Sequence, residues 1–96
     1  MKIIINTCYG GFGLSKQAIE YIWYKHHKVI DQYFGYDNPA DRSDPALVDA
    51  VETLGEKADG RFAELKVVEI PDDVKWHIRE YDGIETIHED HRVWGD

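Results

Sequence analysis

The alternation of apolar and polar residues in the N-terminal part of the chain predicts a strand followed by a helix. The strand is indicated by the uninterrupted apolar run Ile3-Ile4-Ile5, which is typical of a strand covered by neighbours. After Ser15, a suitable N-cap residue, apolar side chains recur at spacings of three and four, at Ala18, Ile19, Ile22 and Trp23. We therefore expect an amphipathic helix from about Lys16 to His27.

A second helix and a second strand are predicted in the middle of the chain. Asp44-Pro45 combines an N-cap residue with proline at the first helical position, and the apolar stripe that follows ends at Gly55. From Phe62 to Ile70 the apolar residues alternate with charged ones, as on a half-buried strand. Between the two helices, the apolar residues of the segment from Lys28 to Ser43 follow neither the helical nor the strand period, so a long loop is expected there. Its aromatic residues form either a lid or a stacking surface, or simply pack over the first helix; they are Tyr33, Phe34 and Tyr36.

The C-terminal part predicts a β-hairpin. Asp82-Gly83 is a strong signal for a two-residue type I′ turn between strands from Lys75 to Tyr81 and from Ile84 to His88. This turn sets His77 opposite His88 on one face, and it puts Trp76, Ile78 and Ile87 on the other, expected to be the core side. Glu80 then faces Glu85, a like-charge pair that costs stability unless a cation lies between them.

These elements predict one α+β domain covering residues 1–96. We expect an α/β two-layer sandwich in which about four strands form one mixed sheet, with both helices on one face and the hairpin at the C-terminus.

Composition narrows the classes of partner. There are 19 acidic residues and 11 Lys and Arg, giving a formal charge of -8, which argues against general binding of DNA or RNA. The single cysteine, Cys8, excludes an internal disulfide and suits a reducing compartment. The apolar run before Asn6 is too short for a signal peptide or a membrane span. A cytoplasmic protein with no membrane association is therefore expected.

The most informative stretch for function is the glycine-rich loop between the first strand and the first helix. Three glycines in four positions allow close approach to a ligand, and the following helix offers free N–H groups and its positive dipole end, so the loop is a candidate anion site. It matches neither the P-loop nor the G-x-G-x-x-G pattern. The alternative is a flexible turn that swings the helix back onto the sheet.

No residue pattern in the chain marks a reacting centre. His77, His88 and His91 are weak candidates for a metal site because they lack a helical H-E-x-x-H frame. Cys8 precedes a helix N-terminus, where a thiolate is stabilised, but no base is evident beside it and a buried apolar role is favoured. We therefore assign no catalytic residue and no cofactor, and we expect a protein without enzymatic activity.

Two functions remain. The first is a binding module that sequesters a phosphate-containing or nucleotide-like ligand, held by loop N–H groups, balanced by cations and stacked on an aromatic ring. The residues assigned to this site are Tyr9, Gly10, Gly11, Phe12, Gly13, Ser15, Lys16, Tyr36, Arg61, Arg79 and Arg92, with Arg42 as a further candidate cation. The second is an acidic protein-interaction module that presents Trp94 and the aromatic loop to a larger partner.

A family resemblance adds context to both functions. The chain resembles small, largely uncharacterised proteins encoded by tailed bacteriophages and prophages, in the segments Cys8–Ser15, Asp44–Val48, Leu54–Ala58, Val68–Val74, Tyr81–Gly83 and His91–Trp94. The resemblance implies an accessory protein in the cytoplasm of an infected bacterium. Small phage accessory proteins often blunt host defence, some by absorbing nucleotide signals and some by binding a defence protein. The resemblance supplies no catalytic residues. Trp94 near the C-terminus either docks on its own domain or reaches a neighbour, and we expect a homo-oligomer.

Overall fold

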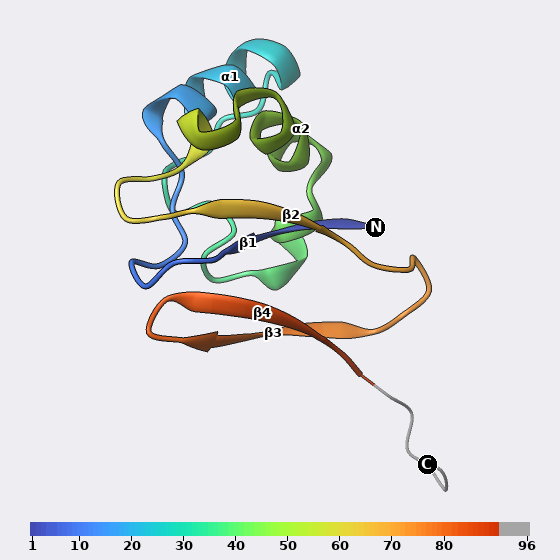
Figure 1. Cartoon of the computed structure of the whole chain (residues 1–96). Helices are drawn as coiled ribbons and strands as arrows, with labels where there is room; N and C mark the ends of the chain where they lie inside the picture. The colour runs from blue at the N-terminus through green and yellow to red at the C-terminus, as the bar shows by residue number, and fades with distance from the viewer. Residues whose placement is uncertain (91–96) are drawn as a thin grey trace, which may run out of the picture.

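The computed structural model describes residues 1–90, and its element order follows the sequence pattern closely. Two α-helices, two short 3₁₀ helices and four strands occur in that range: β1 (Lys2–Asn6), α1 (Lys16–His26), η1 (Pro39–Ser43), α2 (Pro45–Leu54), η2 (Gly55–Ala58), β2 (Leu65–Glu69), β3 (Trp76–Tyr81) and β4 (Ile84–Glu89). The mixed α+β class is confirmed. Both α-helices lie on the same side of β1 and β2, and the hairpin lies on the other side (Figure 1).

The strands form two separate antiparallel sheets, β1 with β2 and β3 with β4, so the expected single four-stranded mixed sheet is not confirmed. β4 does lie beside β1, yet no backbone ladder joins them. The backbone groups of β1 that a neighbouring strand would bond are instead taken by side chains. The N–H of Asn6 donates to Glu85, and the C=O of Ile4 accepts from Arg42. An ion pair thus fills the break in the sheet.

The two α-helices begin after the N-cap residues that the sequence indicated. The Ser15 hydroxyl accepts from the N–H of Ala18, and the Asp44 carboxylate accepts from the N–H of Ala46. α1 ends one residue earlier than expected, because His27 adopts a left-handed conformation (φ 54°) as its C-cap. The loop between the helices is not wholly irregular, since Asn38 caps the 3₁₀ helix η1. No helix within residues 1–90 is long and apolar enough to cross a membrane.

The apolar core lies between the helices and the β1–β2 sheet. Ile4 packs there with side chains from the glycine-rich loop, both helices and η2, namely Phe12, Leu14, Ala18, Leu47, Val51 and Ala58. Ile3 and Ile5 point to the opposite face and are also buried, and β1 contacts η1 and β4 as well as α2. Because β1 is covered on both faces, its sequence is a continuous apolar run rather than an alternating one.

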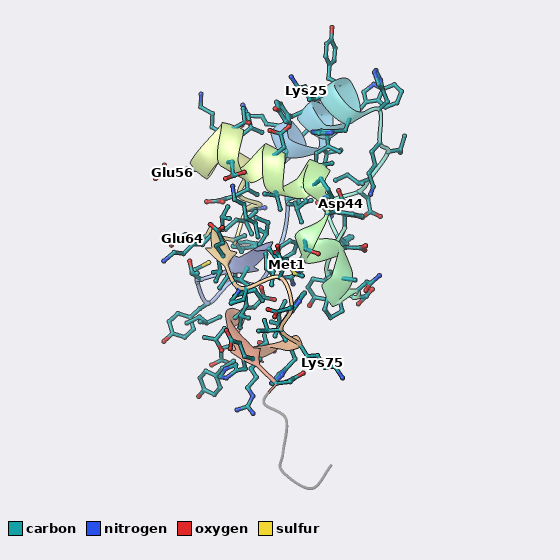
Figure 2. The ribbon with its side chains drawn as sticks, turned by 90° about the vertical axis from the view of Figure 1, so that its right-hand side faces the viewer. Met1, Lys25, Asp44, Glu56, Glu64 and Lys75 are labelled. Carbon is teal, nitrogen blue, oxygen red and sulfur yellow. The ribbon has the colours of Figure 1, made fainter. Side chains whose placement is uncertain are left out.

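The hairpin has the register that its turn predicts. His77 pairs with His88 and Glu80 with Glu85, and Asp82 and Gly83 both have positive φ, at 50° and 91°, as in a type I′ turn. The hairpin face that was expected to join the core does turn toward the rest of the protein, since Glu85 on this face is buried, but its apolar side chains are not fully buried. Trp76, Ile78 and Ile87 are partly exposed, and among residues 1–90 the hairpin adds no member to either buried apolar cluster. In Figure 2 the hairpin, with Lys75 at its start, extends from the rest of the molecule on the side away from the helices.

Candidate functional site

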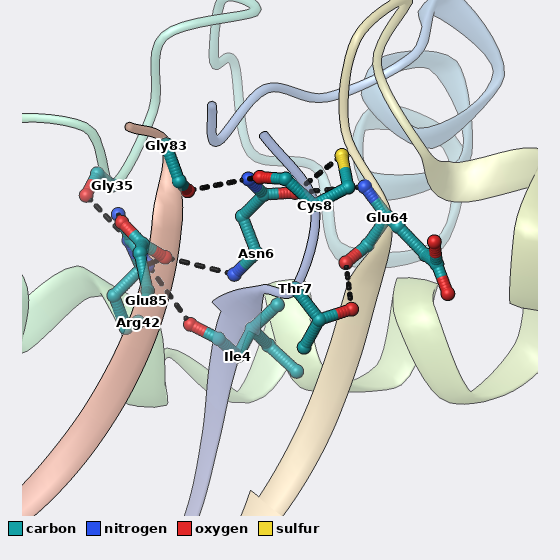
Figure 3. Close-up of polar contacts among 9 residues, drawn as sticks. All are labelled: Ile4, Asn6, Thr7, Cys8, Gly35, Arg42, Glu64, Gly83 and Glu85. Carbon is teal, nitrogen blue, oxygen red and sulfur yellow. Dashed lines mark hydrogen bonds and ion pairs between the residues drawn. The ribbon is translucent and has the colours of Figure 1, made fainter. Parts of the chain in front are cut away.

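A buried ion pair between Arg42 and Glu85 joins the hairpin to the rest of the protein. Two parallel contacts link the side chains, Nη1 to Oε1 at 2.6 Å and Nη2 to Oε2 at 2.8 Å, and the two residues are only 3% and 7% exposed. Arg42 also donates from Nε to the C=O of Gly35 (2.7 Å) and from Nη1 to the C=O of Ile4 (3.1 Å), as Figure 3 shows. Four of its five N–H groups are thereby used within the protein.

Phe12 and Gly35 hold the guanidinium of Arg42 in place. The Arg42 carbon Cζ lies 3.5 Å from the centre of the Phe12 ring, a cation–π contact in a nearly dry environment. Gly35 has φ 89°, and a Cβ built on it would lie 3.2 Å from the Arg42 Cδ atom. Glycine therefore serves both the backbone conformation and the close contact at this position.

Asn6 is the second polar connection, at the end of β1, and it is fully buried. Its N–H donates to Glu85 Oε1 at 2.8 Å, and its Nδ2 donates to the C=O of Gly83 at 2.6 Å and of Cys8 at 2.7 Å. Its Oδ1 accepts from the N–H of Glu64 at 2.7 Å. One side chain therefore ties the glycine-rich loop, the start of β2 and the hairpin turn together (Figure 3).

The glycine-rich loop is packed backbone to backbone against two other loops. A Cβ on Gly10 would lie 1.8 Å from the C=O oxygen of Phe62, and a Cβ on Gly83 would lie 2.5 Å from that of Tyr9. Gly11 needs glycine for its φ of 102°, whereas a Cβ on Gly13 would meet its nearest neighbour only at 4.0 Å. Part of the glycine content is therefore explained by packing alone, without any ligand.

The start of α1 is largely satisfied by the protein itself. The N–H of Ser15 donates to the C=O of Ala58 at 2.9 Å, the N–H of Leu14 donates to that of Gln32 at 3.2 Å, and the Ser15 hydroxyl caps the helix. The open donors lie earlier in the chain. Within residues 1–90, the N–H groups of Gly10, Phe12 and Gly13 have no hydrogen-bond acceptor, whereas the N–H of Gly11 closes the turn at Tyr9 and Gly10 and packs against Gly83.

Among the hollows beside the glycine-rich loop, two have Gly10, Gly11 and Phe12 in common in their linings. The larger, which we call the hairpin pocket, has a volume of about 420 Å³ and is lined by Tyr9, Gly10, Gly11, Phe12, Gly35, Tyr36, Pro39, Arg42, Ile78, Glu80, Gly83 and Glu85. The smaller, which we call the Arg61 hollow, has a volume of about 200 Å³ and is lined by Gly10, Gly11, Phe12, Gly13, Leu14, Gln32, Tyr33, Gly60, Arg61 and Phe62.

The charges of these two hollows differ. The hairpin pocket holds one arginine, neutralised by Glu85, and a further carboxylate on Glu80, so it is negative overall. Arg61 is the one charged residue in the lining of the Arg61 hollow. Carboxylates also lie near Arg61 in the chain. The pKa of one of them, Asp59, is raised, mainly by its partial burial and further by the charges of Glu64 and Glu56. Because its lining has a positive charge and no carboxylate, the Arg61 hollow is the better place for an anion. The hairpin pocket, with its excess of carboxylates, better suits a group that donates hydrogen bonds.

The structure brings together most, but not all, of the residues that the sequence indicated. Tyr9, Gly10, Gly11, Phe12 and Tyr36 line the hairpin pocket, and Gly13 and Arg61 line the Arg61 hollow with Gly10, Gly11 and Phe12. Ser15 is a helix cap, and Lys16 lines neither hollow. Arg79 alternates with Ile78 and Glu80 along β3, so it lies on the opposite face of the hairpin from the pocket. Arg92, His91 and Trp94 lie outside the described residues.

Sequence reasoning missed the roles of Arg42, Glu85, Asn6 and Glu80. A signal for the ion pair was present, because the register set Glu80 against Glu85 and such a pair calls for a cation nearby. Arg42 was one of several candidate cations, and nothing in its local sequence singled it out. Asn6 ends an apolar strand, and its role depends on contacts with residues far away in the chain, Glu64 and Gly83.

The outer face of the hairpin carries the two histidines. Their rings stack with centres 5.6 Å apart, His77 Nδ1 contacts Asp90, and Arg79 donates to His77 at 3.2 Å. No group of three or more His, Cys, Asp or Glu within the described part of the chain is arranged to hold a metal ion. Cys8 is partly exposed, and its sulfur contacts the C=O of Phe62 at 3.1 Å.

Comparison of the chain with protein-family models, with curated proteins and with solved structures finds no match.

Proposed function

We propose that this protein is a phage accessory protein that binds a small phosphate-containing, nucleotide-like ligand at the glycine-rich loop and holds it without turnover. The observation that carries the proposal is the presence of unbonded N–H groups on Gly10, Phe12 and Gly13 within residues 1–90, beside a hollow whose one charged lining residue is Arg61. Backbone N–H groups and a guanidinium are the partners that phosphate oxygens prefer.

The two hollows divide the ligand between them. At about 200 Å³, the Arg61 hollow is smaller than a typical ligand pocket of about 300–1,000 Å³, so it suits a phosphate group rather than a whole nucleotide. The hairpin pocket, at about 420 Å³, falls within that range and has aromatic walls from Tyr9, Phe12 and Tyr36. The ring of the ligand therefore belongs in the hairpin pocket and its phosphate on the other side of the loop. The part of the ligand that joins the ring to the phosphate lies against Gly10 and Gly11, which line both hollows.

Holding a ligand in this way needs no acid, base or nucleophile. The groups assigned to the ligand are backbone amides, one arginine and aromatic rings, which provide charge balance and stacking. Sequestration of a host defence signal is the biological use that we propose for this binding, and the resemblance to phage proteins supports it and binding of a defence protein equally. A cytoplasmic location in the infected bacterium belongs to the same proposal.

A thermal-shift panel of nucleotides, cyclic nucleotides and ADP-ribose derivatives tests the proposal. A ligand at 100 times its Kd stabilises the fold by about 2.7 kcal/mol, which raises the Tm of a domain of this size by about 10 °C or more. Arg61→Gln should abolish the shift. Arg79→Gln also removes one positive charge, but on the hairpin face that points away from the pocket, so this variant should keep the shift. A flat panel, or equal loss in both variants, would contradict the proposal.

A separate observation favours the second candidate function, an acidic protein-interaction module. At the end of α1 away from the glycine-rich loop, Trp23, Tyr24 and Val29 are 53%, 85% and 84% exposed. Exposed apolar side chains that lie together mark protein–protein contact surfaces, and tryptophan and tyrosine are the residues that contribute most to binding at such surfaces. This surface suits a host protein or a second copy of the chain. A mass of 11.2 kDa by light scattering at high protein concentration would rule out a second copy of the chain as the partner.

A further inference from the structure

We infer that the hairpin pocket selects a planar ring with two adjacent N–H donors on its edge, as in guanine, and that Glu80 is the residue that sets this specificity. The inference rests on the proposed function for the phosphate half of the ligand, and it adds which ring the pocket accepts. It follows from which charged side chains of the pocket are already paired and which one remains.

The walls of the hairpin pocket fit a flat, uncharged ring. Tyr9 and Tyr36 are 73% and 60% exposed, so each has a ring face free to stack on a ligand. Pro39 and Ile78 supply further apolar lining. A ring that enters this pocket gains apolar contact on its faces, and its edge meets the polar groups of the lining.

Of the three charged side chains in the lining, Arg42 and Glu85 are committed to the protein. Arg42 is bonded to Glu85, Gly35 and Ile4, and Glu85 Oε1 also accepts from the N–H of Asn6. Glu80 is different. Its Oε1 accepts from the N–H of Gly83 at 2.6 Å, which fixes the carboxylate beside the hairpin turn, and its Oε2 has no partner among residues 1–90.

An ionised carboxylate only accepts hydrogen bonds, so it selects a ring by its donors. Guanine presents N1–H and N2–H side by side, so one of them can donate to the open Oε2 of Glu80 and the other to the second lone pair of Oε1, which the Gly83 N–H leaves free. Adenine sets its amino group beside the acceptor N1, and uracil flanks its N–H with two carbonyl groups; both bring lone pairs against the Glu80 oxygens. The uncompensated charge of Glu80 also keeps phosphate out of this pocket and on the Arg61 side.

Calorimetric titration with guanosine, inosine, adenosine and uridine 5′-monophosphates tests the inference. Guanosine monophosphate should bind tightest, about tenfold or more above adenosine and uridine monophosphates, with inosine monophosphate between them because it lacks the second donor. Glu80→Gln keeps an oxygen for the Gly83 N–H but replaces the other with a donor, so it should remove the preference. Glu89→Gln, on the same hairpin face but outside the pocket, should leave it intact.

The outcomes separate the two proposals. If all four monophosphates bind with equal affinity and lose binding in Arg61→Gln, the base specificity is wrong and the phosphate site stands. If the guanosine preference persists in Glu80→Gln, Glu80 is not its source and the inference is overturned. If none of the four binds at millimolar concentration, both the inference and the proposed ligand class are wrong.

Discussion

The guanidinium of Arg42 and the carboxylate of Glu85 meet in a bidentate pair in the break between β1 and β4, and each also bonds the backbone of β1. In a continuous sheet, the backbone of β4 would make those bonds to Ile4 and Asn6. The pair therefore replaces a strand ladder with side-chain hydrogen bonds. It also forms the floor of the hairpin pocket, so the same contact that attaches the hairpin shapes the proposed ligand site.

Removing the charge of Glu85 should strongly destabilise the fold. Glu85→Gln leaves the buried guanidinium of Arg42 without its counter-charge, and breaking one side of a buried pair typically costs about 3–5 kcal/mol. Urea unfolding followed by tryptophan fluorescence measures the loss. Glu89→Gln, at an exposed position of the same strand, should change stability by no more than about 0.5 kcal/mol. Equal effects of the two substitutions would contradict a structural role for the pair.

The hairpin should open before the rest of the protein. β3 and β4 contribute nothing to the two buried apolar clusters and are attached mainly by polar contacts of Glu85 and Gly83. Amide hydrogen exchange should therefore be faster in the β3–β4 ladder than in the β1–β2 ladder, because segments with few buried apolar contacts open locally at lower free energy. Equal protection of both ladders would show that the hairpin and the helical side unfold together.

The glycines of the loop should differ sharply in their tolerance of a methyl group. Gly10→Ala places a Cβ against the C=O of Phe62, forcing the two loops apart, and should cost about 1–3 kcal/mol. Gly13→Ala meets no atom closer than 4.0 Å and should be nearly neutral. Thermal unfolding of the two variants measures the difference. A destabilised Gly13→Ala would mean that the loop packs more tightly there than the structure indicates.

Asp44 should stabilise the start of α2 in a pH-dependent way. Partial burial alone would raise its pKa, but the Lys28 ammonium and the N–H groups of Ala46 and Leu47 outweigh burial and lower the pKa of the carboxyl. The stabilisation is therefore present above about pH 4 and is lost as the pH falls through the lowered pKa. Asp44→Ala should cost about 1 kcal/mol at pH 7, and the difference from the unsubstituted protein should shrink below pH 4. A pH-independent difference would assign the effect to the backbone conformation instead.

Local signals in the sequence predicted the elements, and their limits explain what was missed. Ser15, Asp44-Pro45 and Asp82-Gly83 act on their immediate neighbours, so helix starts and the hairpin register could be predicted from them. The division into two sheets depends on Arg42 and Glu85, which are far apart in the chain and meet only after folding. The glycine-rich loop was found by composition, but its open donors could be separated from its packed glycines only once Phe62 and Gly83 were placed beside it.

The most direct test of the central claim is an NMR titration of the ¹⁵N-labelled protein with inorganic pyrophosphate, which needs no assumption about the ring. Binding at the glycine-rich loop predicts saturable shifts of the amide signals of Gly10, Gly11 and Gly13, with the Arg61 side-chain signal moving in parallel, and loss of these shifts in Arg61→Gln. If those glycine signals stay in place at millimolar pyrophosphate while the protein remains folded, the loop does not hold phosphate and the proposed function is wrong.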